Sequence, residues 1–169
     1  MSAVAEAVAP RELDPAALPD HLTRLYRAAW AMCGCREDAE DLVQETYARV
    51  LSKRRTLRGG DELGYLLRVL RNTYVSSLRT ADRRPQTAEL VEWAHPAEDR
   101  TTMCPEPAVE ASEVFAIVAA LPAQYRDTLV AVDVAGLSYR EAARALKTRE
   151  GTIMSRLYRA RQQVARRLG

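Results

Sequence analysis

Apolar residues recur at helical spacing along most of this chain, and that periodicity constrains its fold more than any other feature. In the last segment, Ile153, Leu157, Ala160 and Val164 fall on one narrow stripe at about 100° per residue. No segment alternates apolar and polar residues as a half-buried strand does. The sequence therefore predicts an all-α protein.

Glycine and proline separate the periodic segments and mark the approximate ends of seven helices. Ser138 and Glu141 form a capping-box pattern at the start of the sixth helix, and Thr148 is a plausible N-cap for the last. The expected helices cover residues 20–33, 37–50, 61–79, 110–121, 123–135, 139–147 and 149–168.

Two stretches without apolar periodicity divide the chain. Residues 1–19 contain three prolines and predict a disordered tail. Residues 86–111 contain three more prolines and many acids, which predicts a mobile acidic linker. We therefore expect two small helical domains, residues 20–85 and 112–169, each with its own core.

Basic residues gather in two blocks with an acidic block between them. Nine lysines and arginines lie within residues 53–84 and nine within residues 139–169, whereas residues 86–113 hold seven acids and one arginine. Such a distribution favours two surfaces that bind a polyanion. Ordinary solvated helix faces are the alternative for either block alone.

The composition also excludes several classes of protein. No apolar run approaches the roughly 18 residues that span a bilayer, and no signal peptide is evident, so we expect a cytoplasmic protein without membrane insertion. Cys33, Cys35 and Cys104 form no CxxC pair, which argues against a disulfide framework or a metal site and leaves any redox role open. His21 and His95 have no nucleophile or metal partner near them in the sequence, and no glycine-rich phosphate loop exists. We expect neither catalysis nor a cofactor.

The last two helices are joined by a short turn and the second is basic, a pattern typical of a DNA-binding helix-turn-helix. Hydroxyl and guanidinium groups near the start of the last helix can reach base edges in a major groove. Gly151 is unfavourable in a helix, so we expect a backbone or another helix to approach it closely. A plain helical hairpin is the alternative. The candidate DNA-binding residues are Arg149, Thr152, Ser155, Arg156 and Arg159.

At these residues the chain resembles region 4 of the extracytoplasmic-function sigma factors. The matching segments are residues 121–126, 136–143 and 151–161, in the order and spacing of that family. The resemblance implies that the last helix binds the −35 promoter element and that this domain contacts the β flap of RNA polymerase. Met154 stands where the family commonly has a basic residue, so the detailed −35 preference does not follow.

Residues 38–47 resemble region 2.2 of the same family. They form an amphipathic helix whose outer face carries acids and an amide, which can accept hydrogen bonds from a basic helix. The resemblance implies that the partner is the β′ clamp coiled coil. The candidate polymerase-binding residues are Asp41, Gln44, Glu45 and Tyr47.

Residues 65–74 and 79–85 resemble regions 2.3 and 2.4. Opening a promoter requires positive charge to hold a single strand and a pocket for an unstacked base. Asn72 can hydrogen-bond a base edge, and the resemblance places it near a flipped base of the −10 element. The candidate −10 residues are Arg68, Arg71, Asn72, Arg79, Arg83 and Arg84.

Together these resemblances imply an alternative sigma factor that binds core RNA polymerase and promoter DNA, recognises the −35 element and melts the −10 element. They further imply control by an anti-sigma factor. The alternative is an autonomous helix-turn-helix regulator, which would need a dimer surface or a ligand domain that the sequence does not suggest.

Overall fold

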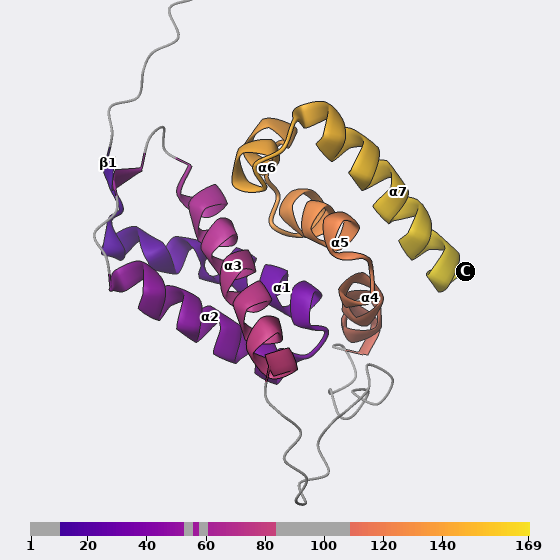
Figure 1. Ribbon diagram of the computed structural model, residues 1–169, viewed down its shortest axis with the longest axis horizontal. Helices are drawn as coiled ribbons and strands as arrows, with labels where there is room; N and C mark the ends of the chain where they lie inside the picture. The colour runs from indigo at the N-terminus through magenta and orange to yellow at the C-terminus, as the bar shows by residue number, and fades with distance from the viewer. Residues whose placement is uncertain (1–10, 53–55, 58–60, 84–108) are drawn as a thin grey trace, which may run out of the picture.

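The computed structural model describes residues 11–52, 56–57, 61–83 and 109–169. Within these ranges the helices form two groups that lie against each other (Figure 1). The N-terminal group contains α1 (Leu18–Cys33), α2 (Arg36–Leu51) and α3 (Glu62–Arg83). The C-terminal group contains α4 (Val109–Ala119), α5 (Ala123–Leu129), α6 (Tyr139–Ala145) and α7 (Glu150–Leu168).

Local sequence explains how α1 ends and α2 begins. Gly34 adopts the left-handed conformation with φ +79°, and its N–H donates to the carbonyl of Trp30 at 2.7 Å. A residue with a Cβ is strained in that conformation, so glycine suits the C-terminal end of a helix. The chain then turns sharply, and α2 packs against both α1 and α3.

The region before α1 differs from the expected disordered tail. Arg11–Glu12 (β1) pairs antiparallel with Thr56–Leu57 (β2), and Pro15–Ala17 (η1) forms a 3₁₀ turn. The Asp14 side chain accepts a hydrogen bond from the Ala16 N–H at 2.9 Å and caps this turn. The prediction that no strand exists was wrong here, because a two-residue strand is too short to show alternation. Residues 1–10 lie outside the described ranges.

In the C-terminal group, α5 continues without a break into a π-helical turn, η3 (Val130–Val134). Its wider spacing is seen in the 2.8 Å hydrogen bond from the Ala135 N–H to the Val130 carbonyl. Gly136 then ends the helix with φ +74°. The predicted helix over residues 123–135 is therefore confirmed as one continuous element with a local change of pitch.

The capping box of α6 is confirmed. The Ser138 hydroxyl and backbone N–H donate to Glu141 Oε2 at 2.7 and 2.8 Å, and the Glu141 N–H donates to Ser138 Oγ at 3.3 Å. The predicted N-cap of α7 was one residue early: the cap is Arg149. The Thr148 N–H still donates to the Ala143 carbonyl at 2.9 Å, so Thr148 closes α6 instead.

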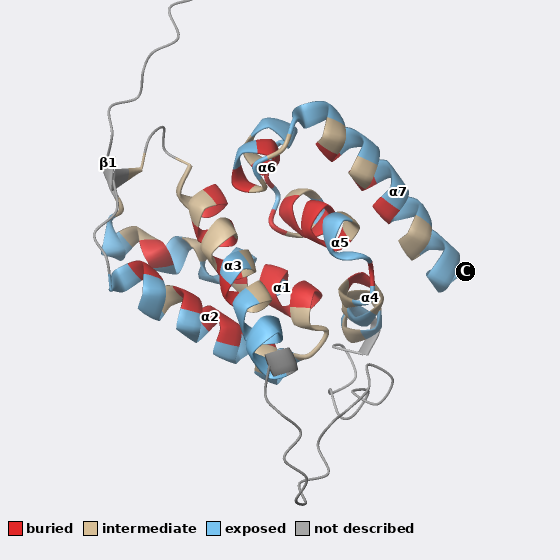
Figure 2. Ribbon diagram, in the orientation of Figure 1, coloured by how far each residue is buried: buried red, intermediate tan, exposed pale blue. Residues whose placement is uncertain are grey.

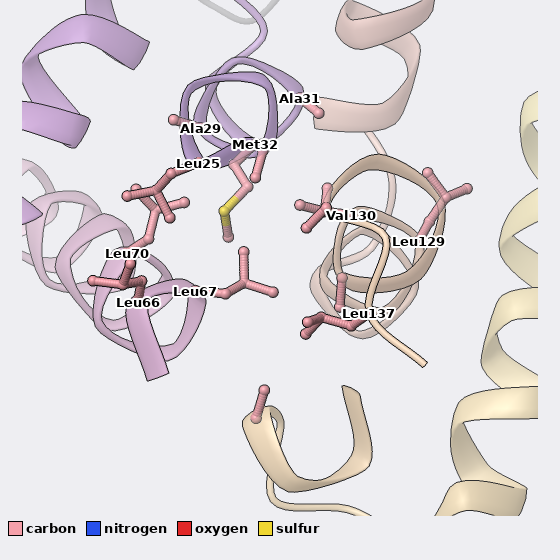
Figure 3. Packing of buried hydrophobic residues seen from close by; sticks show 14 of the residues in the cluster. Leu25, Ala29, Ala31, Met32, Leu66, Leu67, Leu70, Leu129, Val130 and Leu137 are labelled. Atoms are coloured by element: carbon pink, nitrogen blue, oxygen red, sulfur yellow. The ribbon is translucent and has the colours of Figure 1, made fainter. Parts of the chain in front are cut away.

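One apolar core spans both helical groups, contrary to the expectation of two separate cores. Met32 of α1, Leu67 of α3 and Val130 of η3 point into the same space (Figure 3). Buried positions accordingly face inward between the groups (Figure 2). Periodicity identified which residues face inward, but it could not show that two inward faces would meet.

Candidate nucleic-acid interface

The helix-turn-helix consists of α6 and α7, and α7 buries only a narrow stripe. Ile153, Leu157 and Ala160 are buried, while α7 packs on α4, α5 and α6. The outer side of α7 faces solvent (Figure 2). All five predicted residues lie clear of the buried stripe: Arg149, Ser155 and Arg159 are exposed, and Thr152 and Arg156 are half-buried.

The basic groups on this outer side are available to a partner. The side chains of Arg149, Arg156 and Arg159 form no hydrogen bond or ion pair with any residue in the described ranges. Guanidinium groups in this state can bind phosphate or the edge of guanine. The geometry therefore suits a helix that enters a DNA groove.

Tyr158 belongs to the same outer face, and the sequence interpretation missed it. It is 65% exposed, one turn beyond Ser155, and its hydroxyl accepts a hydrogen bond from Gln162 Nε2 at 2.8 Å. Its spacing from Ser155 could have identified it. An aromatic residue in a helix is more readily assigned to the core.

Gly151 is not explained by packing within the protein. A Cβ placed on it would meet no described atom within 4 Å, so the expectation of a close internal neighbour was wrong. Gly151 instead leaves a bare stretch of helix surface one turn before Ser155.

The acidic face of α2 is only partly as predicted. Asp41 and Gln44 are exposed, and Glu45 is exposed but pairs with Arg49 at 2.6 Å, one helical turn away. Tyr47 points elsewhere: its hydroxyl donates to the Leu18 carbonyl at 3.0 Å, and burial raises its pKa. Asp41, Gln44 and Glu45 thus form the accessible acidic face, whereas Tyr47 ties α2 to the start of α1.

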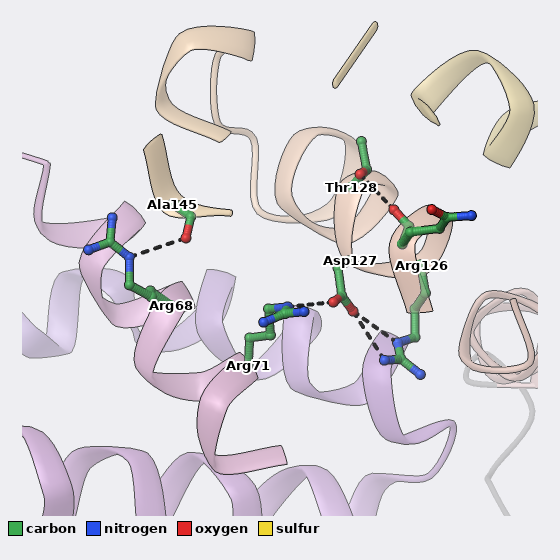
Figure 4. A network of polar contacts seen from close by, with 7 residues as sticks. Arg68, Arg71, Arg126, Asp127, Thr128 and Ala145 are labelled. Carbon is green, nitrogen blue, oxygen red and sulfur yellow. Dashed lines mark hydrogen bonds and ion pairs between the residues drawn. The ribbon is translucent and has the colours of Figure 1, made fainter. Parts of the chain in front are cut away.

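The arginines of α3 split into two sets. Arg68 and Arg71 project toward the C-terminal group (Figure 4). Arg68 donates to the carbonyls of Ala145, at 3.2 Å from Nε, and of Arg144, at 2.7 Å from Nη2. Arg71 Nε donates to Asp127 Oδ2. These two predicted DNA-binding residues are therefore engaged within the protein.

The other predicted −10 residues lie elsewhere. Asn72 and Arg79 are exposed on α3. Arg84 lies outside the described residues, and so does the side chain of Arg83. The structure thus leaves Asn72 and Arg79 as the accessible members of the set.

Asp127 lies at the centre of a buried charged cluster. It is almost fully buried and also accepts hydrogen bonds from Arg126, at 3.2 Å from Nε and 3.1 Å from Nη2. The Arg126 guanidinium lies 4.9 Å from the centre of the Tyr74 ring. Burial raises the pKa of Tyr74, and the nearby Arg126 cation opposes that shift. Periodicity had no means of identifying this cluster, because its members come from α3 and α5.

Two further contacts join the helical groups. Arg24 of α1 donates to the carbonyls of Ala135 and Gly136 at 2.8 and 3.2 Å. The rings of Trp30 and Phe115 meet edge to face with centres 5.0 Å apart. The interface between the groups is therefore both polar and apolar.

Two searches of the described ranges found nothing. No three His, Cys, Asp or Glu side chains there are grouped so that they could hold a metal ion. None of the helices there is both long and apolar enough to cross a membrane.

Comparison with known families matches each half of the chain separately. Residues 19–84 match the model of sigma-70 region 2, and residues 112–164 match that of sigma-70 region 4. The first match covers the acidic face of α2 and the arginines of α3, and the second covers the helix-turn-helix.

Two curated relatives are similar over most of the chain. The ECF RNA polymerase sigma factor SigE of Mycolicibacterium smegmatis is 34% identical over 163 residues, which cover 89% of this chain and 62% of the relative. The ECF RNA polymerase sigma factor SigM of Mycobacterium tuberculosis is 35% identical over 156 residues, covering 88% of this chain and 74% of the relative. The chain thus spans less than two thirds of the length of SigE.

Solved structures share the arrangement of helices. The sigma factor RpoE of Bartonella quintana, in complex with the anti-sigma factor NepR, superposes with a TM-score of 0.63 at 27% identity, covering 89% of this chain and 93% of that one. CnrH, in complex with the cytosolic domain of CnrY, gives a TM-score of 0.61 at 20% identity, covering 89% and 84%, and supports the fold alone.

Proposed function

Since the chain belongs to the extracytoplasmic-function sigma factors of the sigma-70 family, we propose that it binds core RNA polymerase and directs it to specific promoters. The observation that carries this proposal is the presence of two different surfaces in one chain. One is the exposed acidic face of α2, and the other is the exposed basic face of α7. An autonomous DNA-binding protein needs the second surface but not the first.

In this proposal the acidic face of α2 holds the polymerase. Asp41, Gln44 and Glu45 are exposed within about one helical turn. Carboxylates accept short, charge-assisted hydrogen bonds from arginine and lysine. We therefore assign this face to the β′ clamp helices, with Glu45 leaving its weak surface pair with Arg49 on binding.

DNA recognition is divided between the two helical groups. The face of α7 with Arg149, Ser155 and Arg159 binds the −35 duplex, where side chains enter the major groove. Asn72 and Arg79 of α3 act on the melted −10 strand, where an amide can bond an unstacked base. The factor needs no cofactor for either task, because opening is driven by binding and not by chemistry.

Regulation by an anti-sigma protein completes the proposal. The Bartonella quintana relative of the same fold is known in complex with the anti-sigma factor NepR. We propose that a protein of this class holds the present chain in the cytoplasm until it is released to the polymerase.

The sharpest test of polymerase binding is charge reversal on α2. Replacing Asp41→Arg together with Gln44→Arg is expected to abolish capture of core polymerase, measured by co-purification, while leaving the helix content unchanged. The matched control is Asp20→Arg with Thr23→Arg, because these two residues are exposed on α1 and the change in net charge is the same. Equal capture by both double variants would refute the assignment of α2.

A further inference from the structure

We propose that contacts between α3 and the C-terminal group form a latch that keeps the free chain closed, and that this latch must open before α3 can bind the −10 element. The latch consists of Arg68 and Arg71 with their acceptors, the carbonyls of Arg144 and Ala145 and the carboxylate of Asp127. This inference rests on the proposed function and adds a self-inhibited state to it.

The acceptors in the latch offer the arginines what a DNA backbone would offer. Asp127 supplies a full negative charge. The carbonyls of Arg144 and Ala145 lie at the C-terminal end of α6, where a helix carries partial negative charge. Because Arg68 and Arg71 are three residues apart, they share one side of α3 and engage both acceptors together (Figure 4).

Closure blocks one DNA surface and spares the other. A guanidinium that bonds Asp127 faces α5, so a phosphate cannot reach the same Nε–H until the helices separate. The outer face of α7 is not covered by any described part of the chain (Figure 2). The closed chain therefore presents its −35 surface while its −10 surface is incomplete.

Three features make the latch separable. The Arg71 side chain is 38% exposed although that of Asp127 is 4% exposed, so solvent already reaches the arginine. Asp127 keeps Arg126 as a counter-charge when Arg71 leaves, so separation does not strand an unpaired buried carboxylate. At the same interface, Trp30 Nε1 is buried without a hydrogen-bond partner among the described residues, and opening would hydrate it.

Apolar contacts hold the latch closed in the free chain. Phe115 of α4 packs edge to face on Trp30, and Gly34 backs onto Ala119, whose Cβ lies 3.1 Å from where a Cβ on Gly34 would be. Exposing this surface to water opposes opening. Binding of the polymerase would supply the free energy that compensates for it.

The test compares three variants of the full chain. Asp127→Asn removes the acceptor of Arg71, and Phe115→Ala weakens the apolar part of the interface without leaving a buried charge. Asp133→Asn is the matched control, because Asp133 lies in η3 and pairs with Arg161 within the C-terminal group. For each variant, small-angle scattering measures the expansion of the free chain, circular dichroism its helix content, and titration its affinity for core polymerase and for −35 duplex DNA.

Asp127→Asn and Phe115→Ala are expected to expand the free chain and raise its affinity for core polymerase. If about one molecule in ten is open in the wild type, full opening raises that affinity about tenfold, since the apparent Kd scales inversely with the open fraction. Binding to −35 duplex should not change, and Asp133→Asn should resemble the wild type in expansion and in affinity for core polymerase. Should Asp127→Asn fail to fold, Phe115→Ala decides.

Unchanged or weaker polymerase binding by folded Asp127→Asn and Phe115→Ala would overturn the latch, as would an equal gain by Asp133→Asn. In those cases the wild-type chain still captures polymerase, and the proposed function stands. Failure of every variant and of the wild type to capture polymerase would instead refute the proposed function, and the latch with it.

Discussion

The two basic surfaces of this protein are built from the same side chain and stand in different states. On α7, Arg149, Arg156 and Arg159 have no side-chain partner within the described ranges. On α3, Arg68 and Arg71 are bonded to groups of α5 and α6. The difference arises because α7 packs along one narrow stripe, whereas α3 lies between the other helices of its own group and the C-terminal group.

The comparison teaches that an arginine-rich helix is not by itself an available nucleic-acid surface. Availability depends on which neighbours cover the helix, and those neighbours come from distant parts of the chain. Arg71 and Asp127 are 56 residues apart in sequence. A prediction that treats both basic blocks alike therefore misses the difference in readiness between them.

The largest expected effect tests whether the two helical groups stabilise each other. Leu70→Ala in α3 and Ile153→Ala in α7 each delete a fully buried side chain. Each is expected to lower the free energy of unfolding by about 2–5 kcal/mol. Because one core spans both groups, calorimetry should show a single transition that either variant shifts.

Val134→Ala is a suitable control for that experiment, since this half-buried side chain should cost much less. Two separate transitions, each moved by only one of the two core variants, would show that the groups unfold independently and would break the comparison.

Asn72→Ala is expected to separate the two DNA surfaces functionally. Loss of a base contact worth roughly 1–3 kcal/mol reduces open complexes about tenfold or more. Binding to −35 duplex should be almost unchanged, because Asn72 lies on α3. Permanganate footprinting on normal and premelted −10 templates measures the effect, and the premelted template should restore only part of it. Normal promoter opening by this variant would contradict the assignment.

Arg159→Ala and Arg71→Ala compare one arginine from each surface. The α7 variant should weaken −35 duplex binding severalfold and lower the slope of log affinity against log salt by about one if a phosphate contact is lost. The α3 variant should leave both quantities unchanged. Fluorescence anisotropy with a −35 duplex at several salt concentrations gives both, and equal losses would erase the proposed division.

Ser138→Ala probes the start of the helix-turn-helix and is expected to cost about 1 kcal/mol of stability. The Ser138 hydroxyl and N–H hold the pKa of Glu141 below its ordinary value. This stabilisation is complete above the unfolded pKa of about 4.3 and is lost as pH falls through the lower folded pKa. Urea unfolding between neutral pH and pH 3 should therefore show a smaller acid-dependent loss in the variant. Identical pH profiles would rule out the capping box as the cause.

Gly151→Ala should have the smallest effect, and its sign is informative. Nothing described lies within 4 Å of the added methyl group, so helix propensity alone predicts a gain of at most about 1 kcal/mol. Thermal unfolding measures this change. A clear loss of stability would mean that some part of the chain does pack against the start of α7.

The sequence by itself determined the local architecture of this protein. The helical period located the helices and their inward faces, Gly34 and Gly136 marked two helix ends, and Ser138 with Glu141 marked a helix start. The exposed residues of α7 were also predictable, because the buried stripe of a helix defines its opposite face. These features depend on residues three or four positions apart, so a linear pattern contains them.

Only the tertiary structure decided how the helices use one another. It joined two predicted cores into one, turned Tyr47 toward Leu18, and placed Asp127 between Arg71 and Arg126. Such contacts depend on which helix faces meet after the chain folds back on itself. The partners are many residues apart, and the charge or polarity of each residue alone does not reveal whether its partner will be DNA, another protein or the far half of its own chain.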